Sequence, residues 1–142
     1  MRVLGYTTLA LGLALAACTG HRNVAEDIAQ QLRSGATQVD MAHAADFVWD
    51  EMFVFGPYYP KDATCRTLNL DASHCSSAGI SNVDEGEFLL VFMHRGAVSE
   101  TARLPRRIAN FDEGDRCLAR GIRKDVSAFT VERKPGIYLV CR

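Results

Sequence analysis

Five cysteines, and above all the position of the first, constrain what this chain can fold into. Cys18 ends an apolar stretch from Val3 to Ala17, which follows a single positive charge at Arg2. A charged start, an apolar middle and small residues at the end are typical of a secretory signal. The stretch is shorter than the roughly 20 residues that a membrane-spanning helix needs. We therefore expect an exported chain that folds in an oxidising compartment, where cysteines pair.

The end of this signal, Leu15-Ala16-Ala17-Cys18, resembles the lipobox of bacterial lipoproteins. The resemblance implies that a dedicated signal peptidase recognises Leu15, Ala16 and Ala17, and that Cys18 is lipidated and becomes the first mature residue. Two or more acyl chains hold a protein durably at a membrane, whereas a single chain holds it only marginally. The alternative is an ordinary secretory signal followed by an incidental cysteine.

The lipobox resemblance also implies an address in the cell envelope. In enterobacterial lipoproteins an aspartate directly after the lipidated cysteine retains the protein in the inner membrane, whereas this chain has Thr19. We therefore expect a lipid-anchored protein that faces the periplasm, with the outer membrane favoured over the inner. The expected organisation is a signal peptide at 1–17, a tether at 18–22 and a single domain at 23–142, a usual length for one core.

Once Cys18 is set aside, an even set of cysteines remains: Cys65, Cys75, Cys117 and Cys141. Four cysteines allow three pairings. Chain economy favours Cys65 with Cys75 and Cys117 with Cys141, because each closes a short or moderate loop and neither bond must reach across the other. A metal site or a catalytic thiol is the alternative, but no C-x-x-C pair occurs and exported thiols tend to be oxidised. We therefore predict two disulfides.

Hydrophobic periodicity predicts one helix near the start of the mature chain. Apolar residues fall four positions apart at Val24, Ile28 and Leu32, after a capping asparagine at position 23. This pattern predicts an amphipathic helix from about Val24 to Ser34. We expect the helix to lie over a sheet. Binding to a membrane surface is the alternative, which its non-basic polar face does not favour.

The rest of the mature chain favours strands. The aromatic and β-branched run Phe47–Phe55 predicts a central strand buried on much of both faces. Two hairpins are expected later, one from Glu87 to Leu104 around Arg95-Gly96 and one from Ser127 to Cys141 around Pro135-Gly136. Together these runs predict about five mostly antiparallel strands.

Three stretches connect the predicted strands. A short helix is expected after Pro60, and the stretch from Asp71 to Glu85, rich in Ser, Asn and Gly, predicts a loop that the first disulfide ties to that helix. The stretch from Pro105 to Val126 is polar and poorly periodic, and it predicts no element. The expected fold is α+β, with a mostly antiparallel sheet and two helices packed on one face of it.

The most distinctive mature segment runs from Trp49 to Tyr58 as W-D-x4-F-x-P-Y. It resembles a segment of small, largely uncharacterised bacterial envelope lipoproteins, and the resemblance implies no reaction. A carboxylate such as Asp50 in so apolar a strand needs partners, because burying it alone is costly. Candidate partners are Arg103, Arg106 or backbone amides.

Two interpretations of this segment remain open. In the first, Asp50 is a structural carboxylate beside a core tryptophan. In the second, Asp50, Tyr58 and Tyr59 lie at the mouth of a cleft that binds a ligand or a partner. The sequence alone does not decide between them.

Composition and motifs argue against several functions. Lys and Arg number 16 against 17 Asp and Glu, so net charge implies no attraction to nucleic acid or anionic lipid. A glycine-rich phosphate loop is missing, which argues against nucleotide binding. The four histidines lack the close spacing of a metal motif, and no serine lies in a G-x-S-x-G context. We expect no metal, no cofactor and no enzymatic activity.

The remaining expectation is a non-enzymatic envelope lipoprotein that binds or assembles with an envelope partner. The alternative is a periplasmic inhibitor or immunity protein against a cell-wall hydrolase or toxin. An inhibitor would expose a loop with an acidic or aromatic tip, and Asp71 to Glu87 is the candidate. An unrecognised enzyme would instead show Asp50 with a raised pKa in an open pocket.

Overall fold

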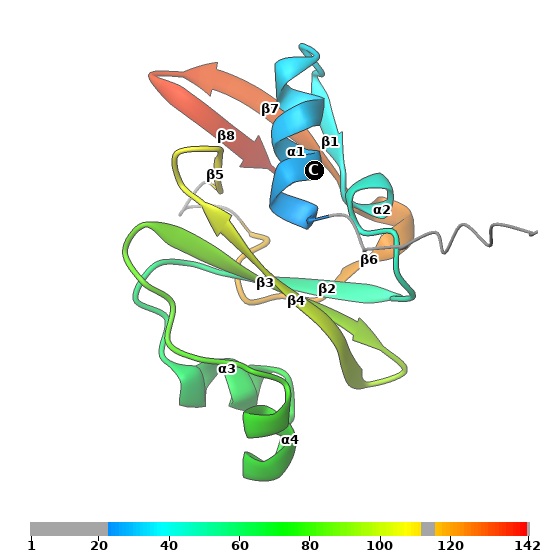
Figure 1. Ribbon diagram of the computed structural model, residues 1–142, viewed down its shortest axis with the longest axis vertical. Helices are drawn as coiled ribbons and strands as arrows, with labels where there is room; N and C mark the ends of the chain where they lie inside the picture. Colours follow the sequence, from blue (N-terminus) through cyan, green and yellow to red (C-terminus); the bar gives the residue numbers. More distant parts are fainter. Residues whose placement is uncertain (1–22, 112–115, 142) are drawn as a thin grey trace, which may run out of the picture.

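The computed structural model describes residues 23–111 and 116–141, and in them the chain forms two four-stranded sheets with helices around them (Figure 1). In chain order, the elements are α1 (Val24–Arg33), β1 (Gln38–Asp40), α2 (Met41–Ala44), β2 (Glu51–Phe55), α3 (Lys61–Thr67), α4 (Ala72–Ser77), β3 (Glu87–His94), β4 (Ala97–Pro105), β5 (Asn110–Phe111), β6 (Ile122–Arg123), a 3-10 turn (Lys124–Val126), β7 (Ala128–Lys134) and β8 (Gly136–Val140). One sheet has the order β4-β3-β2-β6 and the other β1-β7-β8-β5. The paired strands are antiparallel except β5 and β8, which run parallel.

The predicted α+β class with mostly antiparallel strands is confirmed, but the arrangement of layers differs from the expectation. The strands form two sheets rather than one. The helices lie on both faces of the β4-β3-β2-β6 sheet: α1 packs against β4 on the side of the second sheet, whereas α3 and α4 lie on the opposite side (Figure 1).

Strand β3 gives the physical reason for this sandwich. Its side chains point alternately to the two faces of the sheet. Leu90 and Phe92 join a core cluster with α1 and the second sheet, whereas Leu89 and Val91 join a cluster beneath α3 and α4. Because all four are fully buried, each face of β3 needs an apolar layer of its own.

Two predictions about individual elements were wrong: the start of one strand and the absence of a helix from one loop. Strand β2 begins at Glu51 rather than Phe47, because Trp49 is buried in an irregular segment, where its indole N–H donates to the carbonyl of Ala45 at 3.2 Å. The predicted loop from Asp71 to Glu85 contains α4, whose N-terminus is capped by the Asp71 carboxylate accepting from the backbone N–H of His74 at 2.8 Å.

Both disulfides form with the predicted pairing. Cys65–Cys75 joins α3 to α4, with the two Cα atoms 5.8 Å apart. Cys117–Cys141 joins the segment beside β6 to the end of β8, with its Cα atoms 6.0 Å apart. The second bond therefore connects the two sheets, whereas the first holds the two helices of the outer layer together.

The described members of both core clusters lie between residues 24 and 141. The predicted signal peptide at 1–17, the tether at 18–22 and the lipobox residues Leu15, Ala16, Ala17 and Cys18 lie outside the described residues. No helix in the described part of the chain is both long enough and apolar enough to cross a bilayer.

Candidate functional site

A pocket of about 570 Å³ opens where the two sheets meet, beside the disulfide between Cys117 and Cys141. Volumes of roughly 300–1,000 Å³ are typical of small-molecule sites. The floor of the pocket is apolar and consists of this disulfide with Ile122 from β6 and Phe129 from β7. Its rim carries three cations: Arg116, Arg120 and Arg123. We call this site the arginine pocket.

Backbone pairing with β2 positions the segment that supplies most of the pocket. The N–H of Ala119 donates to the carbonyl of Val54 at 2.8 Å, and Ile122 pairs with Met52 across the β2–β6 ladder. At the first of these points Ala119 takes a left-handed φ of 56°, and the chain turns there. This turn brings the arginines on either side of Ala119 to the same rim.

The charge of the rim is only partly compensated. The Arg123 guanidinium donates to the Asp125 carboxylate, and this bond lowers the pKa of Asp125. Arg116 and Arg120 are exposed, and neither forms an ion pair with another described residue. Val126, which is 65 % exposed, lies on the same rim. The pocket therefore combines an apolar floor with two arginines that no other described residue neutralises.

Asp50 lies directly before β2 with its side chain 52 % exposed. One carboxylate oxygen accepts from the backbone N–H of Arg95 at 2.9 Å and lies 3.3 Å from Nδ1 of His94. Of the candidate partners, a backbone amide is the one that the structure places beside Asp50. Arg103 and Arg106, the other predicted partners, do not contact Asp50.

Tyr58 and Tyr59 lie past the opposite end of β2, a strand that spans roughly 16 Å. Tyr59 packs against Phe55 with ring centroids 5.0 Å apart, so it belongs to the core beneath α3. Tyr58 is 69 % exposed and takes a left-handed φ of 64°. The structure therefore does not bring Asp50, Tyr58 and Tyr59 to one cleft, because β2 separates the aspartate from both tyrosines.

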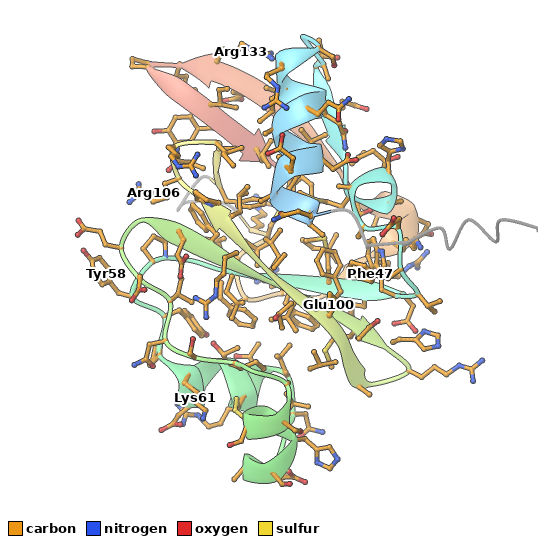
Figure 2. The ribbon with its side chains drawn as sticks, in the orientation of Figure 1. Phe47, Tyr58, Lys61, Glu100, Arg106 and Arg133 are labelled. Atoms are coloured by element: carbon orange, nitrogen blue, oxygen red, sulfur yellow. A yellow bond between two sulfur atoms is a disulfide. The ribbon has the colours of Figure 1, made fainter. Side chains whose placement is uncertain are left out.

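Arginines from the end of β4 hold the loop that precedes β3. Arg103 donates to Glu87 at 2.7 Å and to the Ser81 hydroxyl at 2.6 Å. Arg106, which Figure 2 shows at the same end of this sheet as Tyr58, donates to the carbonyl of Glu85 at 3.5 Å. The predicted inhibitory loop is thus tied to the sheet in its second half, between Ser81 and Glu87.

The exposed part of this loop meets Tyr58. Asp84 and Glu85 are both exposed. The pKa of the Tyr58 hydroxyl is raised, mainly by partial desolvation and to a smaller extent by a hydrogen bond with Glu85. We call Tyr58, Asp84 and Glu85 the Tyr58 tip. It is an aromatic and acidic surface, held by the Arg106 contact with Glu85 and by the hydrogen bond from the Tyr58 N–H to the carbonyl of Val83 at 2.9 Å.

The comparisons give no family for this chain: no protein-family model, curated protein or solved structure matches it. Over residues 23–111 and 116–141, no group of three or more His, Cys, Asp and Glu side chains could hold a metal ion. His74 lies beside Asp71, and His94 beside Asp50, as isolated pairs.

Sequence reasoning missed the arginine pocket, because its residues come from a stretch that predicted no element and from strands of both sheets. The available signal was the spacing of three arginines around a cysteine, at positions 116, 120 and 123. The spacing alone does not predict a pocket, because the pocket forms only where the disulfide places Cys117 beside the second sheet.

Proposed function

We propose that this protein is a lipid-anchored envelope lipoprotein that faces the periplasm and has a non-enzymatic binding role, with the arginine pocket as its binding site. The observation that supports this role most directly is the place of the pocket. Its floor comes from β6 and β7, which belong to different sheets, and a disulfide joins these sheets at the pocket itself. A site on rigid elements binds without the cost of ordering mobile loops.

The lipobox resemblance supports the anchor. A fully extended tether from Cys18 to Asn23 spans at most about 18 Å. The folded domain of an anchored protein therefore stays close to the membrane surface. On this proposal, ligands reach the arginine pocket from the periplasmic side.

Labelled palmitate tests the anchor. We expect the label in the wild-type protein and none in the Cys18→Ala variant, with the wild type recovered in the envelope fraction. Equal labelling of both proteins would contradict lipidation at Cys18. The binding role is tested by pull-down from crosslinked cells, where envelope components should be enriched with the anchored protein and lost with Cys18→Ala.

A second function is favoured by the Tyr58 tip. An exposed tyrosine in a left-handed backbone conformation, beside two exposed carboxylates, matches the aromatic or acidic tip expected of an inhibitor or immunity protein. If this function holds, the crosslinked eluate contains a cell-wall hydrolase or a toxin. Tyr58→Ala should then remove that enzyme from the eluate, whereas Arg116→Gln/Arg120→Gln should leave it there.

A further inference from the structure

We infer that the arginine pocket binds an organic anion that carries an acidic head group, such as a carboxylate or a phosphate, on an apolar body. The inference rests on the proposed function for the choice of site and adds the chemical class of the ligand. It follows from three properties of the pocket: the charge of its rim, the character of its floor and its size.

The rim selects for negative charge. Guanidinium groups present a planar fork of N–H donors that matches carboxylate and phosphate oxygens. Arg116 and Arg120 are exposed on the rim, and neither forms an ion pair with another described residue. Arg123 already donates to Asp125 and contributes less. Two exposed guanidinium groups on one rim favour an anionic head group over a neutral one.

The floor selects for an apolar body. Phe129 is 1 % exposed and Ile122 is 9 % exposed, and the Cys117–Cys141 disulfide lies beside them. Val126 adds an exposed apolar side chain at the rim. A small inorganic anion would leave this surface and most of the 570 Å³ volume in contact with water. An anion with an apolar body would cover both.

The matched pair of 8-anilinonaphthalene-1-sulfonate and N-phenyl-1-naphthylamine tests the inference. Both dyes have the same aromatic body, but only the first carries a sulfonate. The protein used is residues 19–142, which lacks Cys18 and its acyl groups and retains both core clusters. It also retains residues 112, 113 and 115, three acidic neighbours of Arg116 in the sequence that could compete for the arginines. Fluorescence titration gives the dissociation constants.

We expect the sulfonate dye to bind with a stoichiometry of one and to bind more weakly at high salt, because the rim charges are exposed. Arg116→Gln/Arg120→Gln should raise its dissociation constant by about tenfold or more, since each guanidinium supplies charge-assisted hydrogen bonds. The control Arg66→Gln/Arg107→Gln removes the same charge from exposed arginines outside the pocket. It should change the constant by less than about twofold.

The apolar part has its own matched variants. Val126 and Val48 are both 65 % exposed, but only Val126 lies on the rim of the pocket. Val126→Asn should weaken binding of the sulfonate dye, whereas Val48→Asn should not. Near-ultraviolet circular dichroism of each variant checks that the fold is retained. A loss of binding can then be assigned to the substitution and not to unfolding.

Competition distinguishes the sources of the acidic head group. Decanoate and decyl phosphate should each displace the dye, and the stronger competitor identifies the preferred head. Displacement by inorganic phosphate at the same concentrations would overturn the requirement for an apolar body. Equal binding of the two dyes, or binding unaffected by Arg116→Gln/Arg120→Gln, would overturn the anion site. Neither result bears on palmitate labelling of Cys18, so failure of the ligand class and failure of the anchor remain distinguishable.

Discussion

At the scale of single residues, Gly121 shows how close backbone and side chains lie beside the arginine pocket. A Cβ atom at this position would lie 2.7 Å from Cδ and 3.3 Å from Cγ of Glu51. The obstacle is the end of a flexible side chain, so Gly121→Ala should cost about 1 kcal/mol, at the low end of overpacking effects. Urea unfolding measures this cost. In a Glu51→Ala background the same substitution should cost almost nothing, and an equal loss in both backgrounds would contradict the contact.

A second residue-scale prediction concerns the pH dependence of the α4 cap. The backbone N–H of His74, and then its side chain, donate to Asp71 and lower the pKa of that carboxyl below its ordinary value of 3.8. The stabilisation is therefore complete above pH 3.8 and is lost as the pH falls through the folded pKa. Carboxyl NMR should show a depressed pKa for Asp71. His74→Ala should restore only part of the shift, because the backbone donor remains. Full restoration would mean that the imidazole dominates.

At the scale of elements, hydrogen bonds hold the N-terminus and one face of α1. Asn23 caps its N-terminus, accepting from the backbone N–H of Ala25 at 3.0 Å. The Gln31 side-chain amide donates to the backbone carbonyl of Asp40 at 3.2 Å and accepts from the backbone N–H of Asp40 at 2.9 Å. It thus satisfies both backbone groups of Asp40, as a paired strand residue does. Such contacts explain why a helix of only three turns holds its place between two sheets.

Arg133 holds the other end of this helix, as Figure 2 shows. From β7, its guanidinium donates to the carbonyl of Leu32 at 3.2 Å and to that of Ala36 at 3.3 Å. Arg133→Ala should lower the free energy of unfolding by about 1 kcal/mol, because exposure weakens these charge-assisted bonds. Arg107→Ala, which removes an exposed arginine elsewhere, is the control in urea unfolding. Equal effects of the two substitutions would contradict the capping role.

The elements also show what the sequence could and could not predict. The β3–β4 hairpin was predictable, because Arg95 and Gly96 form its two-residue turn with left-handed φ values of 49° and 79°. Helix α4 was missed because its six residues include three serines and a histidine, which are poor helix formers. Only the Asp71 cap marks it. The start of β2 was predicted too early, because an apolar residue such as Trp49 can be buried without pairing in a sheet.

At the scale of the whole molecule, the two disulfides stabilise different parts of the fold. Cys65 and Cys75 are 10 positions apart, and Cys117 and Cys141 are 24 apart. Loop entropy alone predicts similar contributions, about 3 kcal/mol for each. Their positions differ more than their loop lengths, because the first lies within one outer layer and the second joins the two sheets and forms the floor of the arginine pocket. This long-range arrangement is also why periodicity could not predict the pocket.

This difference predicts two distinct patterns of hydrogen exchange. Cys65→Ala/Cys75→Ala should speed exchange in α3 and α4 and leave most of both sheets protected, because the helices can open as a local unit. Cys117→Ala/Cys141→Ala should speed exchange in both sheets together and weaken binding of the sulfonate dye, because the pocket floor loses its fixed geometry. Exchange measured by mass spectrometry on both variants checks the patterns. Loss of protection confined to the segment around Cys117 would show that packing between the sheets, rather than the disulfide, holds them together.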